Sequence, residues 1–512
     1  MLDNDRSIKR TLWWLLAISA LIRCIVAATL EFGNDEAYYW TYALYPDWSH
    51  FDHPPMVGWM IQLFSFNLRF DSEFFIRLAS IVLMTFNTWL MFRIGKEVKD
   101  ARTGLYAALL YTASVYAFVI TGIFILPDTP LSLFWLLAFW MAVKYFKAER
   151  PKSLHLLLFG LFAGLAVLSK YTGVFLWTGM ALYILLFNRK TLKRPALYLA
   201  VLVTAVCCLP ILVWNLQNDF ASIHFHSDRV SLFGKPHLGY FGTELAGEFF
   251  YNNPVNFVLA LLAVIAAFRG KLPLERPVSR LVLCIALPLV AVFLFFSLTR
   301  PTLPHWNAPA YNLLILLSAS LLSSKQKGQD RRAAHPKSIL AALAFLVLTL
   351  GIGYAEIQTG FIPLDRHTEA DRLGRDDFTM DLYGWRQLET RFAELRKQTV
   401  ASGLMDEQDG IIADQWFPLA NLDYYVARPL HLKVMGMGSL GNLHKYQWIT
   451  EERGGFHPGE SYWFLTDSRY LKYPNECFPD QFVSIHHVGT LPIERGGKPA
   501  KNFFVYACKC LK

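Results

Sequence analysis

The chain has 512 residues, of which 54% are hydrophobic and 15% aromatic but only 17% charged. A soluble protein of this length carries roughly a quarter charged residues, so the composition excludes an ordinary soluble chain. The formal net charge of +9 would suit a nucleic-acid binder. The basic residues, however, lie in short clusters between apolar blocks, which indicates membrane topology and no nucleic-acid partner.

The apolar residues gather in blocks of about 18 to 23, the length needed to cross a hydrocarbon core of roughly 30 Å. We expect about eleven membrane spans, near residues 11–29, 74–95, 104–125, 129–147, 153–169, 172–188, 195–216, 253–269, 281–299, 304–323 and 338–357. Basic clusters occupy every second junction, near residues 6–10, 93–102, 144–152, 189–194, 269–280 and 325–337. This pattern predicts a cytoplasmic N-terminus and, with an odd number of spans, a C-terminal segment on the outer side.

The predicted fold class is an all-α polytopic membrane domain over residues 1–359, followed by a mixed α/β periplasmic domain over residues 360–512. Two outer loops are long, at residues 31–72 and 215–252. In the first loop, DEAYYWTYAL predicts a helix, and FDHPPMVGWMIQLF predicts a helix lying at the membrane interface. In the outer domain, DLYGWRQLETRFAELRKQ predicts an amphipathic helix and GIIADQWFPLANLDYYV a strand leading into a helix. SYWFLTD and NFFVYAC predict short strands. A disulfide from Cys477 to one of the two other outer cysteines stays open.

Asp35, in EFGNDEAYYW just after the first span, is the first candidate catalytic residue. A carboxylate at the membrane boundary among aromatic residues costs free energy unless it is paired, solvated or used. Its functional interpretation is a general base that takes a proton from an acceptor hydroxyl. Its structural interpretation is a helix N-cap, a role that Asn34 could fill equally well.

Asp128, in ILPDTPLSLF, is a second carboxylate on the outer side, between the third and fourth spans. It could assist the first carboxylate or orient the acceptor. Asp-Thr-Pro is also a good helix start, so N-capping is the alternative.

Cations are scarce on the outer side, which makes each one a candidate for binding phosphate. They are Lys170 in LSKYTG, Arg300 and His305 in SLTRPTLPHWNAPAY, and His224, His226 and Arg229 in the second long loop. A departing phosphate gains negative charge, and fixed cations beside it lower the barrier. The alternative is snorkelling to lipid headgroups, which needs no function.

His50, Asp52 and His53 in HFDHPP have no spacing that fits a closed zinc pattern. The sequence therefore assigns no metal ligand and no certain cofactor, and a divalent metal stays open.

The string DEAYYWTYALYPDWSHFDHPPMVGWMIQLF resembles the first outer loop of bacterial glycosyltransferases related to the protein O-mannosyltransferases. The lipid A aminoarabinose transferases belong to the same GT-C class. LPDTPLSLFW, LSKYTGVFL and PHWNAPAYN resemble further landmarks of these proteins in the expected order, over about residues 10–360. The C-terminal domain matches more weakly, through DLYGW and ADQWFPLANLDYY.

The resemblance implies that Asp35 is the catalytic carboxylate and Asp128 a second acidic site residue. It implies a polyprenyl-phosphate sugar as donor and a transfer that inverts the anomeric centre. Where the aminoarabinose transferases have a Lys that helps to hold lipid phosphate, this chain has His53, which is only partly charged at neutral pH. The predicted substrate-binding residues are, in chain order, Glu36, Tyr38, His53, Lys170, Arg300 and His305.

The sequence therefore predicts an inner-membrane glycosyltransferase that works at the periplasmic face with lipid A, lipopolysaccharide core or another glycolipid as acceptor. A protein acceptor is the nearest alternative. A flippase for lipid-linked sugar would need ionisable residues near the middle of its spans, whereas this chain gathers its acids at one membrane face. A non-catalytic envelope scaffold is the third alternative. The sugar and the oligomeric state are not predicted.

Overall fold

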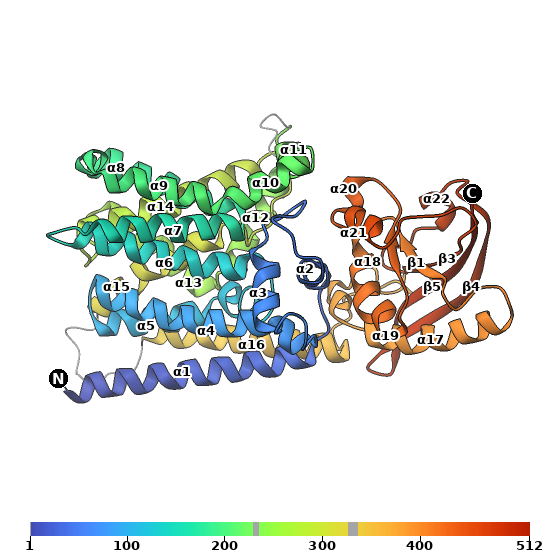
Figure 1. Cartoon of the computed structure of the whole chain (residues 1–512). Helices are drawn as coiled ribbons and strands as arrows, with labels where there is room; N and C mark the ends of the chain where they lie inside the picture. The colour runs from blue at the N-terminus through green and yellow to red at the C-terminus, as the bar shows by residue number, and fades with distance from the viewer. Residues whose placement is uncertain (1, 229–234, 326–335) are drawn as a thin grey trace. The chain divides into compact units, whose positions relative to one another are not determined.

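The computed structural model describes residues 2–228, 235–325 and 336–512. The chain divides by its internal contacts into two compact units (Figure 1). Unit 1 comprises Met1–Ala28 and Asp47–Leu350, and unit 2 comprises Thr29–Pro46 and Gly351–Lys512. The first half of the first predicted outer loop therefore belongs to the same compact unit as the C-terminal residues.

Unit 1 is a bundle of helices, several of which run side by side along its length (Figure 1). Its α-helices are α1 (Leu2–Thr29), α3 (Met56–Phe64), α4 (Glu73–Val98), α5 (Ala101–Ala113), α6 (Asp128–Lys147), α7 (Ser153–Ser169), α8 (Phe175–Phe187), α9 (Pro195–Cys207), α10 (Leu209–Gln217), α11 (Ala221–Asp228), α12 (Leu238–Tyr251), α13 (Pro254–Phe268), α14 (Arg276–Ser297) and α15 (Ala308–Lys325). Helix α16 (Lys337–Thr359) starts in unit 1 and ends in unit 2. A π-helix (Tyr116–Ile120) and two 3-10 helices (Tyr171–Val174 and Arg189–Lys193) complete the described elements.

A helix lies over each of the eleven predicted spans. By length and composition, six helical segments among the described residues could cross a membrane: α1, α4, α6, α9 with α10, α14 and α16. Helices α12 and α13 would make a seventh if they count as one span, although they are bent by 101°. Helices α7, α8 and α15 are apolar but shorter. The number of spans therefore stays a prediction.

Close packing inside the bundle depends on small residues, as is usual between helices in lipid. Gly160 of α7 illustrates this, because a Cβ atom there would lie 2.2 Å from the backbone oxygen of Ala200 on α9. The hydroxyl of Thr204 on α9 donates to the backbone oxygen of the same glycine at 2.6 Å. Any larger side chain at this position would separate α7 from α9.

Unit 2 contains a five-stranded mixed sheet in the order β2-β1-β3-β5-β4. Its strands are β1 (Gly410–Ala413), β2 (Val434–Gly436), β3 (Tyr462–Asp467), β4 (Phe482–Arg495) and β5 (Lys498–Leu511). β1 runs parallel to β2 and β3, whereas β5 is antiparallel to β3 and β4. The helices of this unit are α2 (Asn34–Leu44), α17 (Trp385–Ala401), α18 (Trp416–Leu422), α19 (Arg428–Leu430), α20 (Leu440–Leu443), α21 (Tyr446–Glu452) and α22 (Pro474–Cys477), with a 3-10 helix (Phe378–Leu382) and a π-helix (Asp423–Ala427).

The predicted amphipathic helix is α17, which packs against β4 (Figure 1). The predicted strands at GIIA, SYWFLTD and NFFVYAC lie in β1, β3 and β5. Cys477 and Cys508 belong to one apolar cluster but are free thiols in the structure.

The segment Thr29–Pro46 is held in unit 2 by polar contacts with residues far along the chain. Glu31 accepts hydrogen bonds from the backbone N–H groups of Trp385 at 2.8 Å and Arg386 at 3.2 Å. A carboxylate at this position suits the first turn of α17, where amide groups lack partners. The backbone N–H of Phe32 donates to the Tyr425 hydroxyl at 2.6 Å.

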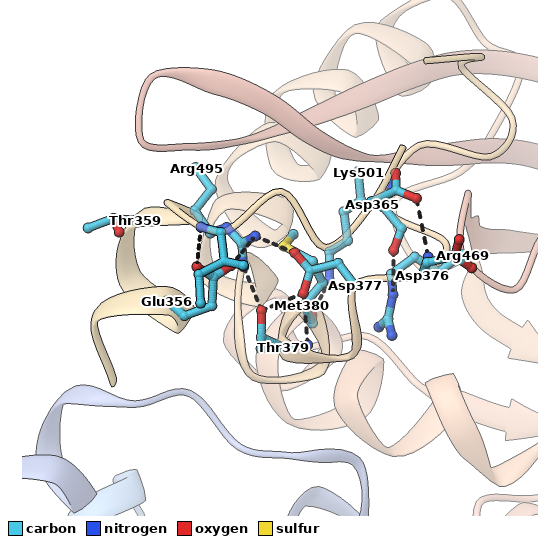
Figure 2. Close-up of polar contacts among 12 residues, drawn as sticks. Glu356, Thr359, Asp365, Asp376, Asp377, Thr379, Met380, Arg469, Arg495 and Lys501 are labelled. Carbon is cyan, nitrogen blue, oxygen red and sulfur yellow. Dashed lines mark hydrogen bonds and ion pairs between the residues drawn. The ribbon is translucent and has the colours of Figure 1, made fainter. Parts of the chain in front are cut away.

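The end of α16 and the residues that follow it are anchored to the sheet by Arg495, at the end of β4 (Figure 2). Its guanidinium pairs with Glu356 at 3.4 Å and with Asp377, and donates to the Thr379 hydroxyl at 2.8 Å. All three charged side chains are buried. Removing a cation from such a group leaves buried carboxylates without a counter-charge.

We predict that Arg495→Met lowers the free energy of unfolding by about 3 to 5 kcal/mol. The matched control is Arg391→Met, which breaks a partly exposed pair with Glu494 at 3.3 Å and should cost less than about 1 kcal/mol. The measurement is the temperature at which protease begins to cut unit 2 in the purified full-length protein. Equal shifts for the two variants would contradict an anchoring role for Arg495.

Candidate functional site

The residues predicted from the sequence to form the site are distributed over both units. Asp35, Glu36 and Tyr38 lie on α2 in unit 2. The others lie in unit 1, and they are His53, Asp128, Lys170, Arg300 and His305. Each group is described within its own unit.

In unit 1 the structure brings Asp128 and Lys170 together. Helices α6 and α7 form a hairpin with a short link, and each is about 25 to 30 Å long at 1.5 Å per residue. The chain therefore returns Lys170, which follows the last residue of α7, to the level of Asp128 at the start of α6. The Lys170 Nζ atom donates to Asp128 Oδ2 at 2.8 Å, and both side chains are buried.

A tyrosine that the sequence analysis missed completes this pair. The Tyr116 hydroxyl donates to Asp128 Oδ1 at 3.2 Å and lies 3.3 Å from the Ser132 hydroxyl. Tyr116 begins the π-helix of unit 1, and such turns are rare and often occur at functional sites. The Asp128 carboxylate thus binds Lys170 and Tyr116, and it makes no N-cap hydrogen bond to its own helix.

His53 lies directly before α3, which packs against α4, α6 and α7. Burial lowers the pKa of the His53 imidazole to about 4. The nearby charge of Lys170 also lowers this pKa, whereas Asp52 and Asp128 raise it. His53 is therefore neutral at pH 7. The neighbouring segment is braced by His226, whose Nε2 lies 3.0 Å from the backbone oxygen of Asp52.

His305 lies in the link between α14 and α15, within electrostatic range of Asp128 and Lys170. Its ring contacts that of Tyr251 with the centroids 6.2 Å apart. Arg300, on the same link, lies over the ring of Phe296 at 4.1 Å. His224 is exposed on α11, and Arg229 lies outside the described residues.

In unit 2, Asp35 is the second residue of α2 and its side chain is exposed. The N-cap position is Gly33, so Asp35 does not cap the helix. That task falls to Glu36, whose Oε2 accepts from the Gly33 backbone N–H at 3.1 Å. The N-cap interpretation of Asp35 is therefore wrong, and Glu36 makes the side-chain hydrogen bond at the start of α2.

Tyr38 lies in the core of unit 2. Its hydroxyl accepts from the Lys445 backbone N–H at 3.2 Å, and its ring lies 5.0 Å from that of Trp416 and 5.9 Å from that of His444. These contacts explain the aromatic residue at this position by packing. Substrate binding by Tyr38 and Glu36 stays a prediction.

Across the described ranges, one group of three side chains is close enough to share a metal ion: Asp365, His367 and Asp376. His367 Nδ1 already lies 2.8 Å from Asp365 Oδ1, and Asp365 Oδ2 accepts from the Gly374 N–H at 2.6 Å. Figure 2 shows the two aspartates beside the Arg495 network. These hydrogen bonds explain the cluster without a metal ion, because they hold the loop between Asp365 and Asp376 in its conformation.

The fold matches solved structures over nearly the whole chain. ArnT from Cupriavidus metallidurans in the apo state has a TM-score of 0.64 at 13% identity, over 98% of both chains. The Archaeoglobus fulgidus oligosaccharyltransferase in the apo form has a TM-score of 0.51 at 12% identity, over 89% of this chain and 69% of that one. The chain thus has an ArnT-like fold, with a helical majority, several apolar helices and a small C-terminal sheet.

Sequence relatives agree with the fold. The family model described as dolichyl-phosphate-mannose-protein mannosyltransferase matches residues 52–214. The lipid A galacturonosyltransferase RgtD of Rhizobium johnstonii is 25% identical over 412 residues, which cover 77% of this chain and 79% of that protein. The undecaprenyl phosphate-alpha-4-amino-4-deoxy-L-arabinose arabinosyl transferase of Pseudomonas paraeruginosa is 30% identical over 335 residues, but the match spans only 56% of that protein and 58% of this chain.

The chain is a glycosyltransferase, and in sequence and fold it is similar to the GT-C proteins that its sequence resembles. The prediction of a membrane glycosyltransferase is confirmed, and the chain is a multi-pass protein of the inner membrane.

We predict that substitutions of the Asp128–Lys170 pair can restore the stability of the protein without restoring its sugar transfer. Lys170→Met leaves the Asp128 carboxylate buried without its cation and should lower the free energy of unfolding by about 3 to 5 kcal/mol. Adding Asp128→Leu replaces the pair with apolar side chains and should restore most of that stability. Sugar transfer should stay lost in the double variant. A double variant that is both stable and active would show that the pair serves packing alone.

A pH-dependent loss of stability should follow from His53. Its pKa is about 4 in the folded protein and roughly 6.5 in an unfolded chain. Between these values the unfolded chain binds a proton that the folded protein does not, so stability is full above pH 6.5 and falls as the pH approaches 4.

At pH 5 the cost should approach about 2 kcal/mol, at 1.36 kcal/mol per pH unit. Thermal unfolding at pH 7.5 and pH 5 is the measurement, and His53→Gln should lose less stability than the wild type on acidification. His457→Gln, at an exposed histidine, should behave as the wild type does. If all three proteins lose the same stability, His53 is not a buried neutral imidazole.

Proposed function

We propose that the chain transfers a sugar from a polyprenyl-phosphate donor to lipid A or a related glycolipid at the periplasmic face, with the N-terminus in the cytoplasm. The observation that carries the proposal is the buried Asp128–Lys170 pair, with His53 and His305 in electrostatic range. A cation held rigidly in a dry site suits a leaving phosphate. The printed names of relatives support both substrates: one is a lipid A transferase, and a solved ArnT structure is bound to undecaprenyl phosphate.

Asp35 is the proposed general base. Its carboxylate takes the proton from the acceptor hydroxyl while that oxygen attacks C1 of the donor sugar. The bond between C1 and the phosphate oxygen breaks, and its electron pair leaves with the polyprenyl phosphate. Attack from the face opposite the leaving group inverts the anomeric centre. The Asp35 side chain is exposed at the start of α2, which lets an acceptor hydroxyl approach it.

Lys170 is the proposed cation for the donor phosphate. Asp128 and Tyr116 hold it through the carboxylate, which fixes the ammonium position before the donor binds. His53 is neutral at pH 7, so it offers a hydrogen bond and no full charge where the aminoarabinose transferases carry a Lys. Arg300 and His305, on one link of unit 1, are the proposed additional contacts.

The principal alternative acceptor is a protein, because the matching family model takes its name from protein mannosyltransferases. A flippase for lipid-linked sugar is the second alternative. Two observations distinguish a glycolipid transferase, a protein transferase and a flippase: which molecules become labelled, and whether the donor crosses the bilayer. One labelling experiment measures both.

We predict that Asp35→Asn lowers transfer of labelled sugar from membrane polyprenyl-phosphate donors by at least about a hundredfold, the usual contribution of a general base. The comparison is made at matched expression with wild type and with Asp47→Asn. Asp47 is an exposed carboxylate of the same predicted loop, and it accepts from the Trp214 indole at 2.8 Å. The control should keep near-normal transfer.

Label that appears in lipid A supports the glycolipid acceptor, and label in protein makes this a protein glycosyltransferase. Normal transfer by Asp35→Asn would mean that another group is the base. If neither the wild type nor the variants transfer label but the donor still crosses the bilayer, the chain is a flippase.

A further inference from the structure

Two buried carboxylates on α12 have no part in the chemistry proposed above. Glu244 and Glu248 are 0% and 1% exposed. They lie four residues apart, so both project from one face of the helix. Within the part of the chain that the structure describes, neither forms an ion pair. Burying a carboxylate without a cation costs several kcal/mol unless hydrogen bonds satisfy its oxygens.

Those hydrogen bonds all come from one segment, residues 298–311, which comprises the link from α14 to α15 and the first turn of α15. The Thr302 hydroxyl donates to Glu244 Oε2 at 2.7 Å, and the Tyr311 hydroxyl donates to Glu248 Oε2 at 2.7 Å. The Asn307 amide donates to both carboxylates, to Glu244 Oε1 at 3.3 Å and to Glu248 by a shorter bond. The two acids therefore bind the link on both sides of His305 and the first turn of α15.

Backbone packing reinforces these bonds. Gly247 lies between the two acids in sequence, and a Cβ atom there would lie 2.0 Å from Cγ of Pro304. The His237 N–H, just before α12, donates to the Leu298 backbone oxygen at 2.7 Å. Helix α12 thus contacts the segment on both sides of His305, and the ring of Tyr251 at its end contacts His305 itself.

We propose that Glu244, Gly247 and Glu248 are positioning residues that hold His305 beside the Asp128–Lys170 pair for the donor phosphate. The donor-binding part rests on the proposed function. The positioning part rests on the contacts alone. Displacing a binding group by about 1 Å can cost a hundredfold in rate, so a rigid support for His305 has a kinetic consequence.

The sharpest test compares two alanine substitutions on α12. Both Gly247→Ala and Gly242→Ala raise helix propensity by about 1 kcal/mol. Only the first adds a methyl group against Pro304, because a Cβ atom at Gly242 would meet nothing within 4 Å. The readouts are kcat and KM for the polyprenyl-phosphate donor, and the rate at which diethyl pyrocarbonate modifies His305, read from its peptide by mass spectrometry.

We expect Gly247→Ala to speed modification of His305 and to lower kcat/KM for the donor by roughly tenfold or more. Gly242→Ala should match the wild type in both. Glu248→Gln, which presents an amide N–H to the Asn307 and Tyr311 donors, should change both readouts in the same direction as Gly247→Ala.

A double-mutant cycle with His305→Ala separates positioning from general loosening. If α12 acts through His305, Gly247→Ala should add little to the loss that His305→Ala already causes. Additive losses, or identical behaviour of the two glycine variants, would overturn the proposal. If the wild type proves inactive with this donor, the proposed function fails. The modification rates then decide the positioning part by themselves.

Discussion

The structure of unit 1 depends on how an apolar bundle holds a buried charge pair. Asp128 and Lys170 each lose hydration on burial, a cost that their mutual attraction offsets only with good geometry and satisfied remaining oxygens. The hairpin of α6 and α7 supplies the geometry, and Tyr116 supplies a bond to the second carboxylate oxygen. Tyr116 is the first residue of the π-helix between α5 and α6. The pair and its tyrosine partner thus join the π-helix, the start of α6 and the residue that follows α7.

The elements themselves were largely predictable, because apolar blocks and alternation are local signals. Helices cover all the predicted apolar segments, and α17, β1 and β3 lie where their patterns indicated. β4 was missed because its HHVGT stretch is polar and largely exposed, and β2 because three residues carry no period. The placement of Thr29–Pro46 within unit 2 was also not predicted. It depends on bonds such as that from Phe32 to Tyr425, which join residues 393 positions apart.

The candidate site was predicted better by residue type than by role. Asp128 and Lys170 were each proposed singly, and the structure pairs them. The sequence predicts both at outer helix ends but gives no sign that α7 returns one to the other. The N-cap interpretations were reasonable for isolated strings and wrong in the structure, where Glu36 and not Asp35 bonds to Gly33. Tyr116, Glu244 and Glu248 were missed. Tyr116 binds a carboxylate 12 residues away, and the two glutamates bind neutral hydroxyl and amide groups. Such partners produce no pattern of opposite charges in the sequence.

Short elements of unit 1 hold several of the candidate site residues. Lipid thickness restricts the lengths of the spanning helices, whereas α3, with 9 residues, is too short to span. α3 carries His53 against α4, α6 and α7, and α12 binds the link that carries His305. Substitutions in such short helices can alter a few polar contacts without altering the packing of the long helices, and a few polar contacts are what substrate choice generally depends on. The likeness to ArnT at 13% identity over 98% of the chain agrees with this view, because a bundle keeps its fold through extensive substitution as long as volume and apolar pattern are kept.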